Sequence, residues 1–159
     1  MRILAIDPGY DRVGVAVVEG TASLPILLHS ECIVTERNTP AENRLASISA
    51  RISKIISKFK PEEMAVESLF FSVNQKTAIG VAEARGCILA EAGKKKIPVR
   101  SFNPNSVKVA VTGYGGSKKA GVTDMVKRLI KMRAMIEHDD EYDAIAIGIA
   151  ALATRRSSK

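Results

Sequence analysis

Four acidic residues stand where the sequence around them is apolar, and their oxygens could hold metal ions. Asp7 closes the apolar run 2–7, and Glu67 closes a second short apolar run. Asp140 and Asp143 open a long apolar stretch, and their spacing of three places them on one face of a helix. Carboxylates brought together repel one another unless a cation lies between them. A cluster of all four would suit Mg²⁺ or Mn²⁺, and two such ions can activate water for phosphodiester hydrolysis.

Each acid also has a simpler interpretation. An Asp at a helix start is commonly a cap, which stabilises the helix by about 0.3–1 kcal/mol. We favour that interpretation for Asp139, and it stays open for Asp140 and Asp143. Asp7 precedes Pro8-Gly9 and could be a turn residue. Sequence spacing by itself does not bring the four side chains together.

The elements expected to position these acids form one α/β domain with a mixed sheet. Apolar, β-branched runs predict strands over residues 2–7, 13–18, 25–34, 64–67 and 97–102. Periodicity and start signals predict helices over residues 41–59, 74–92, 105–111, 118–132 and 140–154. Ligands of open α/β sheets gather at strand ends, which is where two of the acids would lie. We expect the domain to span 1–154, followed by a short basic tail, 155–159.

Composition narrows the class of protein. The 159 residues carry 24 Lys and Arg against 17 Asp and Glu, a net charge of +7, which favours a polyanionic partner such as nucleic acid. No apolar run is long enough to cross a membrane, and the run before Asp7 is too short for a secretory signal, so the sequence predicts a cytoplasmic protein. Cys32 and Cys87 lack metal-ligand spacing and are expected to be reduced core thiols.

Four segments, in this order and at this spacing, resemble the RuvC family of bacterial Holliday-junction resolvases. The segments are Ile6-Asp7-Pro8-Gly9, Ala65-Val66-Glu67-Ser68-Leu69-Phe70-Phe71, Glu83-Ala84-Arg85-Gly86 and Asp140-Glu141-Tyr142-Asp143-Ala144-Ile145-Ala146-Ile147. The resemblance covers nearly the whole chain. It implies a ribonuclease-H-like α/β fold, with a five-stranded mixed sheet flanked by helices on both faces. It also implies a homodimer that nicks four-way DNA junctions symmetrically, leaving 5′-phosphate and 3′-OH ends, and partners of the RuvA/RuvB branch-migration type.

The resemblance also implies roles for individual residues. Asp7, Glu67, Asp140 and Asp143 would be catalytic and hold two Mg²⁺ per subunit, with Mn²⁺ able to substitute. Lys108 and Lys119 match positions beside the cut phosphates and would be catalytic as well as contact DNA. Phe70 and Phe71 would contact DNA by stacking on bases.

Simpler interpretations of these positions stay open. The lysines could be ordinary surface residues, Lys118 could serve in place of Lys119, and one of the two Phe rings could lie in the core. The small-residue stripe Ala78, Ala82 and Gly86 matches the helix that family dimers pair, although such stripes also pack on sheets. His138 is expected to be a solvated loop residue.

Two other classes of protein share part of this pattern. Actin-like ATPases and sugar kinases also place an acid at a strand end before a Gly-containing hairpin. They contain two such domains and a second phosphate loop, which this sequence lacks. A junction-binding module without catalysis would be basic as well, but clustered acids give a binder of polyanions no advantage.

Overall fold

The structure is a computed structural model that describes residues 1–69, 75–130 and 136–154. Within these residues lie five strands: β1 (Arg2–Asp7), β2 (Arg12–Gly20), β3 (Pro25–Val34), β4 (Glu63–Glu67) and β5 (Val99–Phe102). They form one sheet in the order β3-β2-β1-β4-β5. β2 is antiparallel to both β1 and β3, whereas β4 is parallel to both β1 and β5. The mixed five-stranded sheet expected from the sequence is confirmed.

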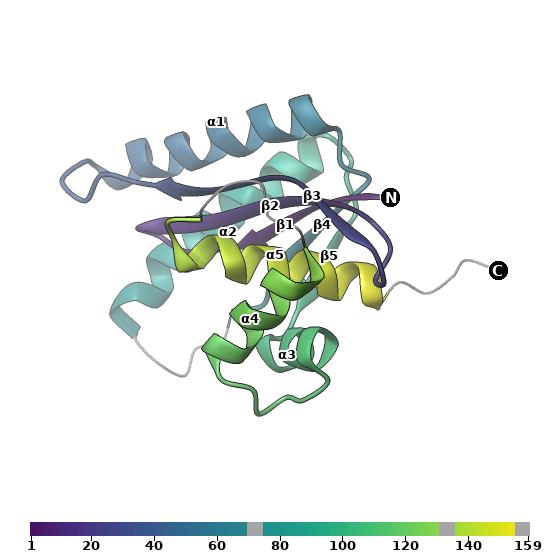
Figure 1. Cartoon of the computed structure of the whole chain (residues 1–159). Helices are drawn as coiled ribbons and strands as arrows, with labels where there is room; N and C mark the ends of the chain where they lie inside the picture. Colours follow the sequence, from purple (N-terminus) through teal and green to yellow (C-terminus); the bar gives the residue numbers. More distant parts are fainter. Residues whose placement is uncertain (70–74, 131–135, 155–159) are drawn as a thin grey trace.

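Helices cover both faces of the sheet, as expected (Figure 1). Those described are α1 (Ala41–Phe59), α2 (Gln75–Lys94), α3 (Pro104–Thr112), α4 (Lys119–Leu129) and α5 (Asp139–Ala153). α1 and α2 pack together on one face, and α5 lies across β1 and β2 on the other, flanked by α3 and α4. α5 is apolar on all sides because the sheet, α3 and α4 surround it.

β1 is the central strand, and its side chains alternate between two cores. Ile3 and Ala5 pack with α5, whereas Leu4 and Ile6 pack with α1, and all four are fully buried. This alternation is the two-residue period of a strand, and covering both faces makes the whole strand apolar. A charged side chain fits only at an end of this strand, and Asp7 is its last residue.

The structure corrects three local expectations. His138 is the last loop residue before α5, at its N-cap position, and is partly buried instead of fully solvated. Asp139 therefore lies in the first helical turn and is not the cap. Cys32 and Cys87 are free but only partly buried, so neither is a core thiol. Burial, with Asp140 nearby, raises the pKa of Cys32 to about 11.

Most element boundaries differ from the expected ones by a few residues. The helix expected over 118–132 is α4, which ends at Leu129, and residues 131–135 lie outside the described part of the chain. None of the described helices is both long enough and apolar enough to cross a bilayer.

Candidate active site

The two strand-end acids lie side by side. β1 and β4 are parallel neighbours, and Ile6 is in register with Val66, so the residues that follow, Asp7 and Glu67, lie at the same edge of the sheet. Their carboxyl groups lie close enough together for each to shift the pKa of the other. The parallel pairing brings together two acids that are far apart in the chain.

α5 reaches this edge because β2 has a glycine there. Gly14 pairs with Asp7 across the β1–β2 hairpin. A Cβ on Gly14 would lie 2.0 Å from the carbonyl oxygen of Asp140, which is far inside van der Waals contact. The missing side chain therefore allows the first turn of α5, with both of its acids, to rest on the strand beside Asp7.

A hollow of about 280 Å³ opens at this edge. Its polar lining contains three of the four predicted carboxylates and two of the three predicted lysines: Asp7, Glu67, Asp143, Lys108 and Lys119. Its apolar wall comes from the start of α3 and from α4 and α5, through Pro104, Val107, Val122, Ala146 and Ile147. The fourth predicted carboxylate, Asp140, does not line the hollow.

Burial and mutual repulsion control the charge of the paired acids. Burial raises the pKa of Asp7 well above its usual value, and the charges of Glu67, Asp143 and Asp140 raise it further. Burial also raises the pKa of Glu67, with Asp143 adding to the effect and the Lys108 ammonium opposing it. Such shifts mark a site where negative charge is concentrated in a poorly solvated space.

The two predicted ligands on α5, Asp140 and Asp143, form ion pairs with different basic side chains. The carboxylate of Asp143 lies 2.9 Å from the Lys119 ammonium, which lies 3.7 Å from the exposed Asp139. Burial opposes the charge on Lys119, but the hydrogen bond and charge of Asp143 outweigh it and raise the Lys119 pKa. The Oδ2 atom of Asp140 lies 3.2 Å from Nε of Arg12. That oxygen is buried and has no hydrogen bond to any described residue.

The chemistry of these donors fits divalent cations, although the side chains do not lie in ligand geometry. No three acidic, His or Cys side chains among the described residues are placed to share an ion. Asp140 and Asp143 pair with Arg12 and Lys119, and mutual repulsion disfavours a closer approach of the four carboxylates. Hard carboxylate oxygens, a partly buried acid of raised pKa and a buried oxygen without a hydrogen bond are what Mg²⁺ or Mn²⁺ would satisfy.

Two arginines at the site were missed by the sequence interpretation. Nε of Arg85 on α2 donates to the backbone oxygen of Glu67 (3.2 Å), and its Nη2 donates to the hydroxyl of Ser101 (2.9 Å). Arg85 lies in one of the four segments that resemble the RuvC family, so the sequence could have indicated its place at the site. Nothing in the local sequence marks Arg12, because its partner Asp140 lies near the other end of the chain.

The remaining predicted DNA contacts are placed only in part. Lys118 is exposed at the N-cap position of α4, next to Lys119, and does not line the hollow. Phe70 and Phe71 lie outside the described side chains, so their predicted stacking role stays a prediction.

A five-stranded mixed sheet, with acids ending its first and fourth strands beside an acidic helix start, defines a nuclease of the ribonuclease-H-like class. The family model described as "Crossover junction endodeoxyribonuclease RuvC" matches residues 3–151. The chain therefore belongs to the RuvC family, and it is an endonuclease.

Individual relatives agree with this assignment. Crossover junction endodeoxyribonuclease RuvC of Thermotoga petrophila is 41% identical over 147 residues, which cover 92% of this chain and 89% of that protein. RuvC of Petrotoga mobilis is 39% identical over 159 residues, covering 100% of this chain and 98% of that protein. Thermus thermophilus RuvC, solved with a Holliday junction substrate, superposes with a TM-score of 0.91 at 32% identity, covering 96% of this chain and 93% of that one.

Proposed function

We propose that this protein resolves four-way DNA junctions by paired, symmetric nicks, through hydrolysis assisted by two divalent cations per subunit. The observation that carries the proposal is the pair of adjacent, partly buried acids, Asp7 and Glu67, in one hollow with Asp143 and two lysines. Asp7, Glu67, Asp140 and Asp143 would hold Mg²⁺, or Mn²⁺ in its place. The bound ions would supply Lewis-acid activation of the attacking water and stabilise the leaving oxygen.

The two lysines would act on the phosphate. Lys108 lies close enough to Glu67 to oppose the rise in that residue's pKa, and Lys119 pairs with Asp143, so both ammonium groups border the proposed reacting centre. Positive charge fixed there stabilises charge that develops on the phosphate oxygens during in-line attack by water. Departure of the 3′ oxygen would leave a 5′-phosphate and a 3′-OH.

The cofactor requirement is tested on synthetic DNA. With Mg²⁺ or Mn²⁺ we expect two nicks in strands of like polarity on a four-way junction, and no cleavage of a linear duplex of the same sequence. EDTA should abolish cleavage. DNA ligase should seal the nicks, because it needs a 5′-phosphate beside a 3′-OH. Cleavage in EDTA, or nicks that ligase cannot seal, would contradict the proposed chemistry.

We further propose a homodimer formed through α2, so that two active sites reach two strands of one junction. Gly86 has no atom within 4 Å of where a Cβ would lie, and Ile79, seven positions earlier and therefore on the same face, is 69% exposed. Ala78 and Ala82 of the predicted stripe are partly buried beside this face. An exposed face of small residues around one large apolar side chain suits close helix–helix pairing.

Replacing Gly86 with Arg should break this dimer. A long charged side chain at the centre of a close helix–helix contact would hold the helices apart and bury an unpaired charge. By light scattering after gel filtration we expect the wild type as a dimer and Gly86→Arg as a monomer. Gly121→Arg is the matched control, because Gly121 on α4 is equally open, and it should remain dimeric. A dimeric Gly86→Arg protein would rule out the α2 interface.

The remaining assignments concern the whole chain. The nuclease domain would span residues 1–154, and the tail 155–159 would take no part in the chemistry. The protein would act in the cytoplasm. Branch-migration proteins of the RuvA/RuvB type are the proposed partners, by analogy with the family.

A further inference from the structure

Arg12 is a basic residue at the active site whose present contact is weak. It is the first residue of β2, and its side chain is 52% exposed. Its Nε lies 3.2 Å from Oδ2 of Asp140, yet that oxygen makes no hydrogen bond with any described residue. An ion pair that has no hydrogen bond, and whose cation is half exposed, is easily exchanged for another partner.

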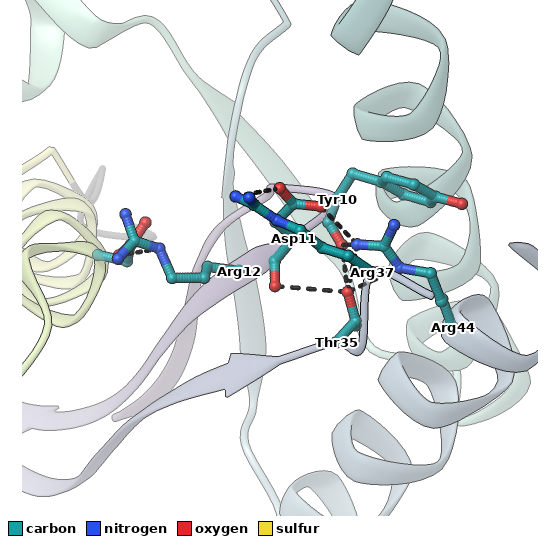
Figure 2. A network of polar contacts seen from close by, with 7 residues as sticks. Tyr10, Asp11, Arg12, Thr35, Arg37 and Arg44 are labelled. Carbon is teal, nitrogen blue, oxygen red and sulfur yellow. Dashed lines mark hydrogen bonds and ion pairs between the residues drawn. The ribbon is translucent and has the colours of Figure 1, made fainter. Parts of the chain in front are cut away.

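The turn that precedes Arg12 is anchored by polar contacts on the α1 side of the sheet (Figure 2). The buried guanidinium of Arg44 donates to the backbone oxygen of Tyr10 (3.2 Å), to Oδ1 of Asp11 (2.5 Å) and to Oγ1 of Thr35. It also lies 3.9 Å from the centre of the Tyr10 ring. Asp11 accepts a further bond through its backbone oxygen from the amide of Thr35 (2.9 Å). The turn before Arg12 is therefore a fixed support.

Neighbouring residues of a strand point to opposite faces, and Val13, the next residue of β2, packs on the α1 side, so Arg12 points toward α5. Asp11 faces Arg37 and Arg44, whereas Arg12 extends the other way toward α5 (Figure 2). Arg12 thus reaches the site from β2, whereas Lys108 and Lys119 come from α3 and α4.

The charge on Asp140 determines what Arg12 binds. With no cation nearby, the Asp140 carboxylate is the anion next to Arg12. A divalent cation held by Asp140 would neutralise that carboxylate and remove its attraction for the guanidinium. Once released, the solvent-exposed guanidinium can bind another anion. Its planar set of N–H donors fits a phosphate group.

We propose that Arg12 contacts a phosphate of the DNA strand in the active site, and that this contact forms when a divalent cation releases Arg12 from Asp140. The inference rests on the proposed carboxylate site. It adds a DNA-binding residue at the start of β2, next to Asp140.

The test compares Arg12→Gln with Arg37→Gln in junction binding. Arg37 is a matched control, because it is also an exposed arginine in an ion pair, 2.9 Å from Asp11, but on the opposite side. Affinity for a fluorescent four-way junction is measured by anisotropy over a range of salt, once in Ca²⁺ and once in EDTA. Intact DNA is verified on a denaturing gel. Thermal melting verifies folding, and Arg12→Lys, which keeps the charge, provides a second variant.

The expected result depends on the cation. In Ca²⁺, Arg12→Gln should bind the junction about tenfold more weakly than the wild type. The slope of log affinity against log salt should then be shallower by about 1. In EDTA the variant should match the wild type, and Arg12→Lys should keep the wild-type slope in both buffers. Arg37→Gln should show the same difference from the wild type in Ca²⁺ as in EDTA.

Three outcomes would overturn the proposal. An unchanged slope for Arg12→Gln in Ca²⁺ would show that Arg12 meets no phosphate. An equal change of slope in both buffers would show that the cation does not release it. If Arg12→Gln bound the divalent cation more weakly in a calorimetric titration, with an unchanged slope of log junction affinity against log salt, Arg12 would only position Asp140 as a metal ligand. Failure of the proposed function would appear separately, as wild-type protein that does not cut junctions in Mg²⁺.

Discussion

Asp7→Asn should lower the rate of junction cleavage at least about a thousandfold while leaving junction binding intact. Asp7 is the acid whose pKa is raised most clearly by burial and by the other three carboxylates, so it lies at the centre of the negative charge. An amide has nearly the same shape but no charge, so packing persists while the proposed site loses its central ligand. Single-turnover cleavage in Mg²⁺ and anisotropy binding in EDTA measure the two effects.

The same substitution should stabilise the protein when no metal is present. Because the folded-state pKa of Asp7 is raised, its contribution to stability is complete below the unfolded-state pKa and is lost as pH rises through the folded-state value. At neutral pH the ionised carboxylate therefore opposes folding, and Asn removes that penalty. We expect a higher melting temperature for Asp7→Asn than for the wild type at pH 7 in EDTA, with the difference shrinking in acid.

Asp139→Asn is the matched control for both effects. It removes one negative charge close to the site, but Asp139 is 76% exposed and lies outside the hollow. Its cleavage rate should stay within a few-fold of wild type, and its melting temperature should hardly change. Wild-type cleavage by Asp7→Asn would show that the assignment of the carboxylate site is wrong.

Gly14→Ala should damage the active site without touching any of its charged groups. The added Cβ would lie 2.0 Å from the carbonyl oxygen of Asp140, and that backbone atom cannot move without the helix. α5 would shift and carry Asp140 and Asp143 away from Asp7. We expect a loss of cleavage of at least about a hundredfold. Overpacking of this kind also lowers the free energy of unfolding, by about 1–3 kcal/mol.

The measurement separates displacement of α5 from unfolding. Cleavage is followed against Mg²⁺ concentration at a temperature where circular dichroism shows the variant folded, and a higher Mg²⁺ requirement is expected. Gly93→Ala is the control, because a Cβ at Gly93 meets no atom within 4 Å and Ala favours a helix by about 0.5–1 kcal/mol. Normal cleavage and stability in Gly14→Ala would show that α5 does not depend on this close approach.

Much of this architecture follows from local patterns in the sequence. The apolar run before Asp7, the helical stripe in 41–59 and the apolar stretch after Asp143 predict a strand and two helices that the structure contains. Period-two and period-3.6 patterns reflect burial on one face or both, and that burial holds throughout an element. Helix ends carry no such period, and α5 starts one residue earlier than expected.

The tertiary structure decided how the acids are arranged and what they meet. The spacing of Asp140 and Asp143 puts them on one helix face, yet one pairs with Arg12 and the other with Lys119. Those partners come from β2 and α4, so the outcome depends on how α5 packs over the sheet. Gly14 looks like an ordinary strand residue until the backbone of Asp140 is placed against it. The sequence alone determined which residues carry charge and on which elements, because those patterns are local. Long-range packing decided which charged side chains form pairs, and a local sequence pattern carries no information about that packing.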